Sequence, residues 1–242
     1  MFNTISNNSS EKVIDNEYIK KYWVGLMDGD GSIQVNHWRK KSLQYRFIIK
    51  LKFYPENKEM LDLIQKTIGG NVRLIKTDFV IWVENNKTNI NRLLGILEEF
   101  PPLTSRLRAQ IKFMKENFHR NDIEWYFNNR DNKYQFRDTM IDTNVSYYPA
   151  WLSGFIEAEG CFSVRKSNNH SFNIGQNDDK YLIESIKNYF DLQNQIRNPY
   201  KTFWFIETYR QSSFHKISEH FNIYPLLGQK FTSYLVFKEH IK

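Results

Sequence analysis

Two segments of the chain carry acidic residues at matching positions, and these acids could act together. Residues 22–35 read YWVGLMDGDGSIQV, and residues 150–164 read AWLSGFIEAEGCFSV. A shift of 129 positions (159 − 30) aligns Asp30 with Glu159, and each of these acids is followed by glycine. Paired carboxylates are typical ligands of Mg²⁺, which prefers hard oxygen donors. The repeat therefore predicts that Asp30 and Glu159 bind a divalent cation together.

Each segment is expected to form a helix that packs closely against its duplicate. Gly25 and Gly29 lie four residues apart, hence on one helix face, and Gly154 and Ala158 repeat that spacing. Small residues at this spacing let two helix backbones approach each other. Two parallel helices would then bring two acids together at their C-terminal ends, where the helix dipole and the like charges disfavour them. Stability alone would not select this arrangement, and a bound cation resolves it.

Two simpler interpretations of the first segment are weaker. A single Gly-x-x-x-Gly followed by acids is usually part of an ordinary turn. Asp28, Asp30 and Ser32 also resemble the first ligands of a calcium-binding loop. That loop needs glycine at its sixth position and glutamate at its twelfth, where this chain has Ile33 and Arg39. The duplication favours the paired metal site over both alternatives.

The rest of the chain also indicates a duplicated unit of about 100 residues. FPPLTSRLRAQIKF (100–113) resembles YPLLGQKFTSYLVF (224–237), with Arg106 opposite Lys230. We expect each copy to run helix, strand, strand, helix, strand, strand, helix, helix. In the first copy, apolar periodicity places helices near 18–29, 57–68, 88–99 and 104–118, and strands near 31–38, 43–54, 71–77 and 78–84.

The duplication predicts the domain boundaries. We expect a flexible N-terminus at 1–15, a first repeat at 16–118 and a second repeat at 148–242. The polar stretch between them, 119–147, is expected to be an irregular linker. Since one chain holds both repeats, a monomer is expected.

Composition narrows the function classes. Lys and Arg number 34 against 27 Asp and Glu, a net charge of +7 that suits a phosphate backbone. The single Cys161 excludes an internal disulfide and a cysteine-built zinc site. His215 and His220 lack a ligand frame and are expected on the surface. No apolar stretch is long enough for a membrane helix, so no membrane partner is expected.

The residue usage also suggests a genetic origin. Asn, Ile, Lys, Phe and Tyr are abundant, whereas alanine occurs only at Ala109, Ala150 and Ala158. Residues with AT-rich codons are thus favoured, as in an organelle genome. Residues 1–10 resemble neither a signal nor a transit peptide, which an organelle-made protein does not need. We therefore expect a mitochondrial protein, with the chloroplast as the second option.

The segments WVGLMDGDG (23–31) and LSGFIEAEG (152–160) resemble the two signature motifs of the LAGLIDADG homing endonucleases. The resemblance is to the single-chain, double-motif form encoded by organellar group I introns, and it covers nearly the whole chain. It implies an α+β fold of two pseudo-symmetric αββαββα repeats. The motif helices would pack at the centre, and two saddle-shaped antiparallel sheets would grip DNA.

The resemblance also implies roles for the acids. Asp30 and Glu159 would bind metal across the two scissile phosphates, with the main-chain carbonyls of Gly29 and Ala158 as co-ligands. The earlier acid of each motif, Asp28 or Glu157, would be structural. Mg²⁺ is the expected metal, Mn²⁺ is a second option, and Ca²⁺ is expected to bind without supporting cleavage.

Further catalytic residues follow from the same resemblance. A basic residue near the start of the last helix of each repeat would assist the transition state, which corresponds to Lys230 and, less faithfully, to Arg106. The glutamine at the end of the second strand corresponds to Gln176 in FNIGQ. The first repeat has no glutamine around 53–55, so the two half-sites are expected to be cut unequally.

The polar face of each sheet is expected to contact DNA, because Arg, Lys, Asn and Gln read base edges in the major groove. In the first repeat these residues are Gln34, Asn36, Trp38, Arg46, Lys50, Lys52 and Arg73. In the second repeat they are Ser163, Arg165, Asn173 and Arg197.

Three functions are compatible with the sequence. The first is a homing endonuclease that makes double-strand breaks with short 3′ overhangs at a long intron-insertion site in double-stranded DNA. The second is a group I intron maturase that binds its own intron RNA, with or without DNA cleavage. The third is a DNA-binding module without activity, which is disfavoured because both motifs retain their acids.

Overall fold

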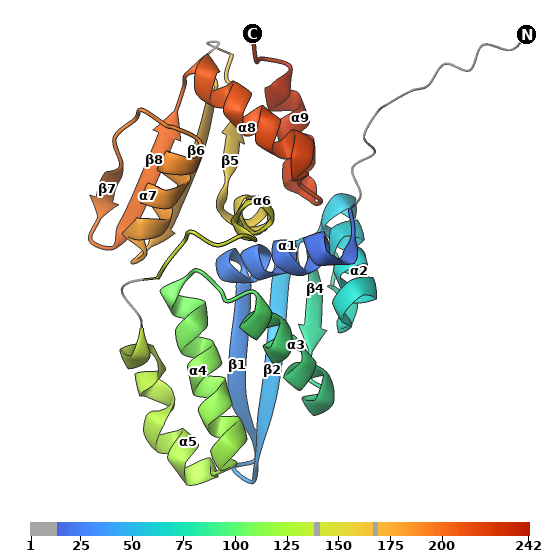
Figure 1. The fold of residues 1–242 in the computed structure, drawn as a ribbon. Helices are drawn as coiled ribbons and strands as arrows, with labels where there is room; N and C mark the ends of the chain where they lie inside the picture. Colours follow the sequence, from blue (N-terminus) through green and yellow to red (C-terminus); the bar gives the residue numbers. More distant parts are fainter. Residues whose placement is uncertain (1–13, 138–140, 167–168) are drawn as a thin grey trace, which may run out of the picture.

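The computed structural model describes residues 14–137, 141–166 and 169–242. The first repeat follows the predicted order of helices and strands (Figure 1). Its elements are α1 (Asn16–Gly29), β1 (Gly31–Trp38), β2 (Ser42–Lys52), α2 (Pro55–Ile68), β3 (Asn71–Ile75), β4 (Phe79–Glu84), α3 (Lys87–Glu99) and α4 (Ser105–Arg120).

The second repeat has the same order, and most of its elements are shorter. They are α6 (Tyr148–Glu159), β5 (Cys161–Ser163), β6 (Ser171–Asn177), α7 (Lys180–Tyr189), β7 (Arg197–Tyr200), β8 (Phe203–Thr208), α8 (Gln211–Ile223) and α9 (Gln229–Lys238). Each repeat forms one antiparallel four-stranded sheet, ordered β1-β2-β4-β3 or β5-β6-β8-β7. The predicted fold of two αββαββα repeats is confirmed.

The alternation of side chains in β2 explains why one face of the first sheet is buried. Tyr45, Phe47 and Ile49 are buried, whereas Gln44 and Lys50 are exposed. Successive side chains of a strand point to opposite faces of its sheet. The apolar face is covered by the helices, and the polar face is left open to solvent.

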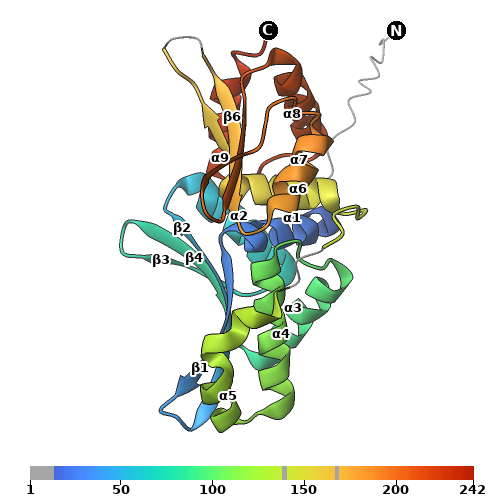
Figure 2. The ribbon, with the colours of Figure 1, turned by 90° about the vertical axis from the view of Figure 1, so that its left-hand side faces the viewer.

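The two motif helices form the centre of a core that both repeats share. Both lie side by side across the middle of the molecule, between the two sheets (Figures 1 and 2). Their large, fully buried side chains include Tyr22, Trp23, Leu26, Trp151 and Phe155. A helix that is apolar on nearly all sides must be covered on all sides. The shared core therefore joins the two repeats into one body.

The segment between the repeats is more ordered than the sequence suggests. We expected an irregular linker at 119–147, but it contains α5 (Ile123–Asn129) and a 3₁₀ helix, η1 (Arg130–Phe136). The Tyr126 and Phe127 rings of α5 lie 6.1 and 4.9 Å from the His37 ring of β1. These aromatic contacts hold α5 against the first repeat and correct the prediction.

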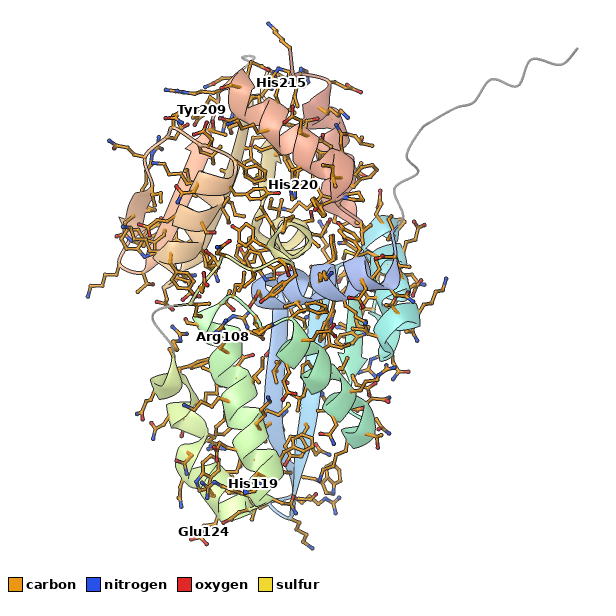
Figure 3. All side chains as sticks on the ribbon, viewed as in Figure 1. Arg108, His119, Glu124, Tyr209, His215 and His220 are labelled. Carbon is orange, nitrogen blue, oxygen red and sulfur yellow. The ribbon has the colours of Figure 1, made fainter. Side chains whose placement is uncertain are left out.

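The surface prediction holds for one of the two histidines. His215 is exposed on the outer side of α8, whereas His220 is buried beneath that helix (Figure 3). Nε2 of His220 lies 2.9 Å from the Ser153 hydroxyl, and Nδ1 lies 3.0 Å from the Tyr189 hydroxyl. The surface prediction for His220 is therefore wrong, because the ring completes a polar network between α6, α7 and α8.

Across the ranges that the structure describes, no helix is both long and apolar enough to cross a bilayer.

Candidate active site at the paired helix ends

The motif helices are in direct backbone contact. A Cβ atom added to Gly25 would lie 1.9 Å from the carbonyl oxygen of Trp151. A Cβ atom added to Gly154 would lie 1.9 Å from the carbonyl oxygen of Tyr22. Since any larger residue would collide with the other backbone, both positions need glycine. The reciprocal contacts place the helices as a parallel, pseudo-symmetric pair.

The predicted metal-binding acids lie where these helices end. Asp30 follows the last residue of α1 and is exposed, and Glu159 is the last residue of α6 and is half-buried. A Cβ atom added to Gly29 would lie 2.2 Å from the Cβ of Ala158 and 3.6 Å from Oε1 of Glu159. The Glu159 carboxylate of α6 thus lies beside Gly29 of α1, the residue directly before Asp30.

The electrostatics of this junction disfavour two ionised acids. Burial and the charge of Asp30 together raise the pKa of Glu159 to about 7, although Arg106 and Lys230 oppose the rise. Burial also raises the pKa of Asp30 although its side chain keeps contact with solvent, and Lys230 and Arg106 again oppose the rise. In the described part of the chain, neither carboxylate accepts a hydrogen bond that could offset this cost.

The earlier acid of the first motif has a different environment. Asp28 is fully buried and accepts hydrogen bonds from the main-chain nitrogens of Leu103 and Thr104 at 2.7 and 3.1 Å. The Thr104 hydroxyl donates to the same carboxylate. Because Thr104 is the N-cap of α4, Asp28 fixes the start of that helix.

Glu157 performs the same task in the second repeat. Its carboxylate accepts hydrogen bonds from the main-chain nitrogens of Gly228 and Lys230 at 3.1 and 2.9 Å. Gly228 is the N-cap of α9. Each motif therefore uses its earlier acid to position the helix that carries a predicted basic residue.

Each structural acid also receives a hydrogen bond from the opposite repeat. Trp151 Nε1 donates to Asp28 at 2.7 Å, and the Tyr22 hydroxyl donates to Glu157 at 2.9 Å. This exchange between the repeats was not predicted from the sequence. The shift of 129 positions that pairs the motif acids also pairs Tyr22 with Trp151 (151 − 22), which was the available signal.

The two predicted basic residues differ in their contacts. The Arg106 guanidinium donates to the carbonyl oxygens at the end of α1, those of Met27, Asp28, Gly29 and Gly31, at 2.7 to 3.2 Å. The Lys230 ammonium has no hydrogen bond or ion pair within the described ranges, although it lies near both acids. Arg106 therefore caps a helix, whereas Lys230 is available to a ligand.

The residues present fit a hard divalent cation in part. Among the described residues, no group of three His, Cys, Asp or Glu side chains could hold a metal alone. A cation at Asp30 and Glu159 would thus need further oxygens from the main chain, water or a phosphate. The Gly29 carbonyl already accepts one hydrogen bond from Arg106 at 3.2 Å, but a carbonyl oxygen has two lone pairs. The set of oxygen donors suits Mg²⁺.

Gln176 does not share the open face of its sheet. It pairs with Trp204 in the β6–β8 ladder and is buried, on the same face as Phe172 and Ile174. Asn173 points to the opposite face. The side chain of Gln176 therefore lies on the helix-covered side of the sheet. The catalytic role of Gln176 stays a prediction.

All seven predicted DNA-contact residues of the first repeat lie on one face. The register places Gln34 opposite Arg46, and Lys50 opposite Ile81, which in turn pairs with Arg73. Asn36, Trp38 and Lys52 follow at alternate positions of the same strands. Trp38, at the outer end of β1, is 55% exposed.

The predicted set of the second repeat is also brought together. Ser163 and Asn173 share a face of the β5–β6 ladder, and Arg197 joins them through Phe205. Arg165 follows β5, and its guanidinium lies 3.4 Å from the carboxylate of Glu207, the residue opposite Asn173.

A family comparison matches both repeats. The family described as LAGLIDADG endonuclease matches residues 23–117 and 152–241. The chain is 44% identical to the "Probable intron-encoded endonuclease aI3" of Dictyostelium citrinum, over 94% of this chain and 97% of the relative. It is 41% identical to the protein of the same name from Debaryomyces hansenii, over 98% of this chain and 40% of that longer relative.

Solved structures share the fold. The I-LtrWI LAGLIDADG homing endonuclease bound to target DNA superposes with a TM-score of 0.74 at 23% identity, over 93% of this chain and 90% of that one. I-SmaMI bound to an uncleaved DNA target in the presence of calcium ions superposes with a TM-score of 0.68 at 17% identity, over 91% and 89% of the two chains.

Proposed function

The chain belongs to the LAGLIDADG endonuclease family, and on that premise we propose that it is a site-specific DNA endonuclease. It would hydrolyse both strands of a long target at an intron insertion site and leave short 3′ overhangs. One observation carries the proposal most directly: Asp30 and Glu159 meet at the paired helix ends without hydrogen-bond partners in the described structure, at an electrostatic cost. An arrangement that lowers stability is typical of a functional site.

The side chains divide the work. Asp30 and Glu159 would hold the divalent cation, which would supply activation of water and stabilisation of charge on the leaving oxygen. Lys230 places its ammonium group near the scissile phosphate and offsets the negative charge that develops there. Arg106 holds the end of α1, so that Asp30 keeps its position relative to Glu159. Only the second-repeat base is therefore free to approach a phosphate, which favours unequal cutting of the two strands.

Mg²⁺ is the metal that we propose. The ligands that we propose are carboxylate and carbonyl oxygens, which suit a hard cation. Mn²⁺ should substitute for it. Ca²⁺ should bind without supporting cleavage, in keeping with I-SmaMI, whose complex with calcium ions holds an uncleaved target.

The open sheet faces are the proposed DNA-contact surface. Arg46, Lys50 and Arg73 project from the first sheet, and Arg197 lies on the matching face of the second. Together with the net charge of +7 they favour a phosphate-bearing partner. The shared core of the two repeats supports a monomer, and the abundance of residues with AT-rich codons, together with the intron-encoded relatives, supports a mitochondrial gene product.

The maturase function is the second candidate, because the relatives are intron-encoded and the same positive charge suits RNA. Incubation with Mg²⁺ of a random DNA library, an intron-insertion duplex and the host intron RNA separates the two functions. The endonuclease proposal expects discrete double-strand breaks that EDTA prevents. If the insertion duplex stays intact while splicing of the intron RNA is accelerated, the maturase function replaces it.

A further inference from the structure

The helices between the two repeats place positive charge beside the first sheet. Among the strands of the described ranges, β1 is an edge strand whose only partner in the sheet is β2. A groove runs along this free edge and is lined on one side by Gln34 and Asn36 of the proposed DNA-contact face. Its other side is lined by Arg130 and Lys133 of η1. The linker cations thus border the same groove as residues that we place against DNA.

This arrangement is fixed by contacts on both sides of the groove. Gln110 of α4 accepts a hydrogen bond from the main-chain nitrogen of Ile33 at 2.8 Å and donates to the Tyr134 hydroxyl at 3.0 Å. The glutamine therefore ties the edge of β1 to η1. Figure 2 shows α5 lying alongside β1, as the ring contacts of His37 require.

Cations from two separate segments converge at this edge. The Lys40 ammonium of the β1–β2 turn lies 6.0 Å from the centre of the Phe127 ring, and the Arg130 guanidinium lies 5.3 Å from the same centre. The turn itself carries three consecutive exposed cations, Arg39, Lys40 and Lys41. Arg39 lies 5.1 Å from the ring of the exposed Trp38.

The negative charge nearby is small. Asp131 is the only acid among the described residues that line the groove, and its carboxylate lies 3.8 Å from Arg130 Nε. That acid is 87% exposed at its side chain, and such surface pairs contribute little. Glu124 lies at the end of α5 that is remote from η1 (Figure 3).

Covering the edge of β1 does not explain the charges. An unpaired strand edge is protected when a helix or loop lies over it. Here Tyr126 and Phe127 contact β1 for that purpose, and aromatic side chains suffice. Like charges gathered around one ring raise the energy of the isolated protein, and they become favourable when an anion lies between them.

We propose that Arg130 and Lys133 of η1, with Lys40 of the neighbouring turn, bind backbone phosphates of the DNA beside the first sheet. The inference rests on the proposed function, since it places DNA on the adjoining face. The contacts are electrostatic and sequence-independent, and they extend the footprint on the first-repeat side only. The segment between the repeats is then a DNA-binding element as well as a connection.

The test compares Arg130→Gln/Lys133→Gln with a matched control, Lys66→Gln/Lys115→Gln. The control removes the same charge from two helices on the side of the sheet away from the proposed DNA-contact face. Lys66 belongs to α2, and Lys115 belongs to α4 and pairs with Glu98. Binding is measured in Ca²⁺ at several salt concentrations, on a duplex carrying the site that the wild type selects from a random library. Thermal melting of each variant checks folding.

The proposal expects a shallower salt dependence for the η1 variant alone. Loss of two phosphate contacts should reduce the slope of log K against log salt by about 1.8, so its affinity deficit should shrink about tenfold between roughly 50 and 200 mM salt. Shortening the duplex at the end beside the first repeat should remove the higher affinity of the wild type over the η1 variant, whereas shortening it at the other end should not. Equal slopes for wild type and the η1 variant, or equal effects of both double variants, would overturn the inference. If the wild type itself selects no site, the proposed function fails instead.

Discussion

Replacing Glu159 with glutamine should stabilise the metal-free protein even though it removes a proposed metal ligand. Burial and the charge of Asp30 raise the pKa of Glu159 from its usual 4.5 to about 7. The folded state therefore binds the proton of this acid more tightly than the unfolded state does. The stability that protonated Glu159 gives the folded state is lost as the pH rises from 4.5 through about 7. Above that range the ionised acid lowers the free energy of unfolding by roughly 3 kcal/mol.

The stability gain from Glu159→Gln should depend on pH, because only the ionised acid is costly. With a pKa of about 7, the cost at about pH 5.5 is roughly 1.4 kcal/mol, against roughly 3 kcal/mol at about pH 8. Since Glu159 keeps partial contact with solvent, we expect a measured gain of about 1 to 3 kcal/mol for Glu159→Gln at pH 8 and a smaller gain at pH 5.5. Urea unfolding in EDTA at both pH values measures the difference.

Glu157 provides the matched control, two residues earlier on the same helix. Burial raises the pKa of Glu157 as well, but the hydrogen bonds that its carboxylate accepts from Tyr22, Gly228 and Lys230 oppose the rise and would be lost, so Glu157→Gln should destabilise by about 1 to 3 kcal/mol. Added Mg²⁺ should stabilise the wild type more than Glu159→Gln. The reasoning is refuted if Glu159→Gln destabilises at pH 8, or if its effect is the same at both pH values.

Three further predictions concern packing, the two bases and a buried histidine. Gly25→Ala should destabilise the protein by more than about 3 kcal/mol in thermal or urea unfolding, because the added Cβ would meet a backbone oxygen at 1.9 Å. In the control variant Gly95→Ala in α3, the added Cβ meets nothing within 4 Å, so stability should rise by up to about 1 kcal/mol. Equal effects of the two variants would contradict the close packing of the motif helices. Arg106→Met should lower the free energy of unfolding by about 1 to 3 kcal/mol, because Arg106 caps the end of α1. Lys230→Met should change the free energy of unfolding by less than about 0.5 kcal/mol but slow DNA cleavage roughly 100-fold. The reverse pattern would mean that Lys230 has the structural role and Arg106 the catalytic one. Burial lowers the pKa of His220 to about 3, so only the unfolded state takes up this proton below the usual pKa of 6.5, and the contribution of His220 to wild-type stability should fall by about 1.4 kcal/mol on going from pH 8 to pH 5.5. His220→Gln should lack this part of the pH dependence in urea unfolding, and identical pH profiles for the variant and the wild type would argue against a buried neutral ring.

Periodicity and duplication predicted the fold because both are properties of the sequence itself. The alternation from Tyr45 to Phe53 identified β2, and the shift of 129 positions identified the motif helices as partners. The helix–strand order followed from these patterns. The element ends differ by one or two residues in most cases, as at Pro55, where proline begins α2.

The parts that the sequence did not predict depend on tertiary contacts. Helix α5 spans only seven residues, too few for a clear apolar period, and it is held by rings such as Phe113 and His37 that are distant in the sequence. The burial of His220 depends on partners from two other helices. The sequence also cannot show that Arg106 caps a helix whereas Lys230 does not, because only the fold places the Arg106 guanidinium against the carbonyl oxygens at the end of α1.

DNA cleavage by Asp30→Asn and Glu159→Gln, with binding measured in the same samples, tests the central claim most directly. Wild-type protein in Mg²⁺ should cut both strands of its selected site. Both variants should bind that site with near wild-type affinity, remain folded and leave it uncut. If either variant cuts the site at the wild-type rate, then Asp30 and Glu159 do not form the catalytic pair.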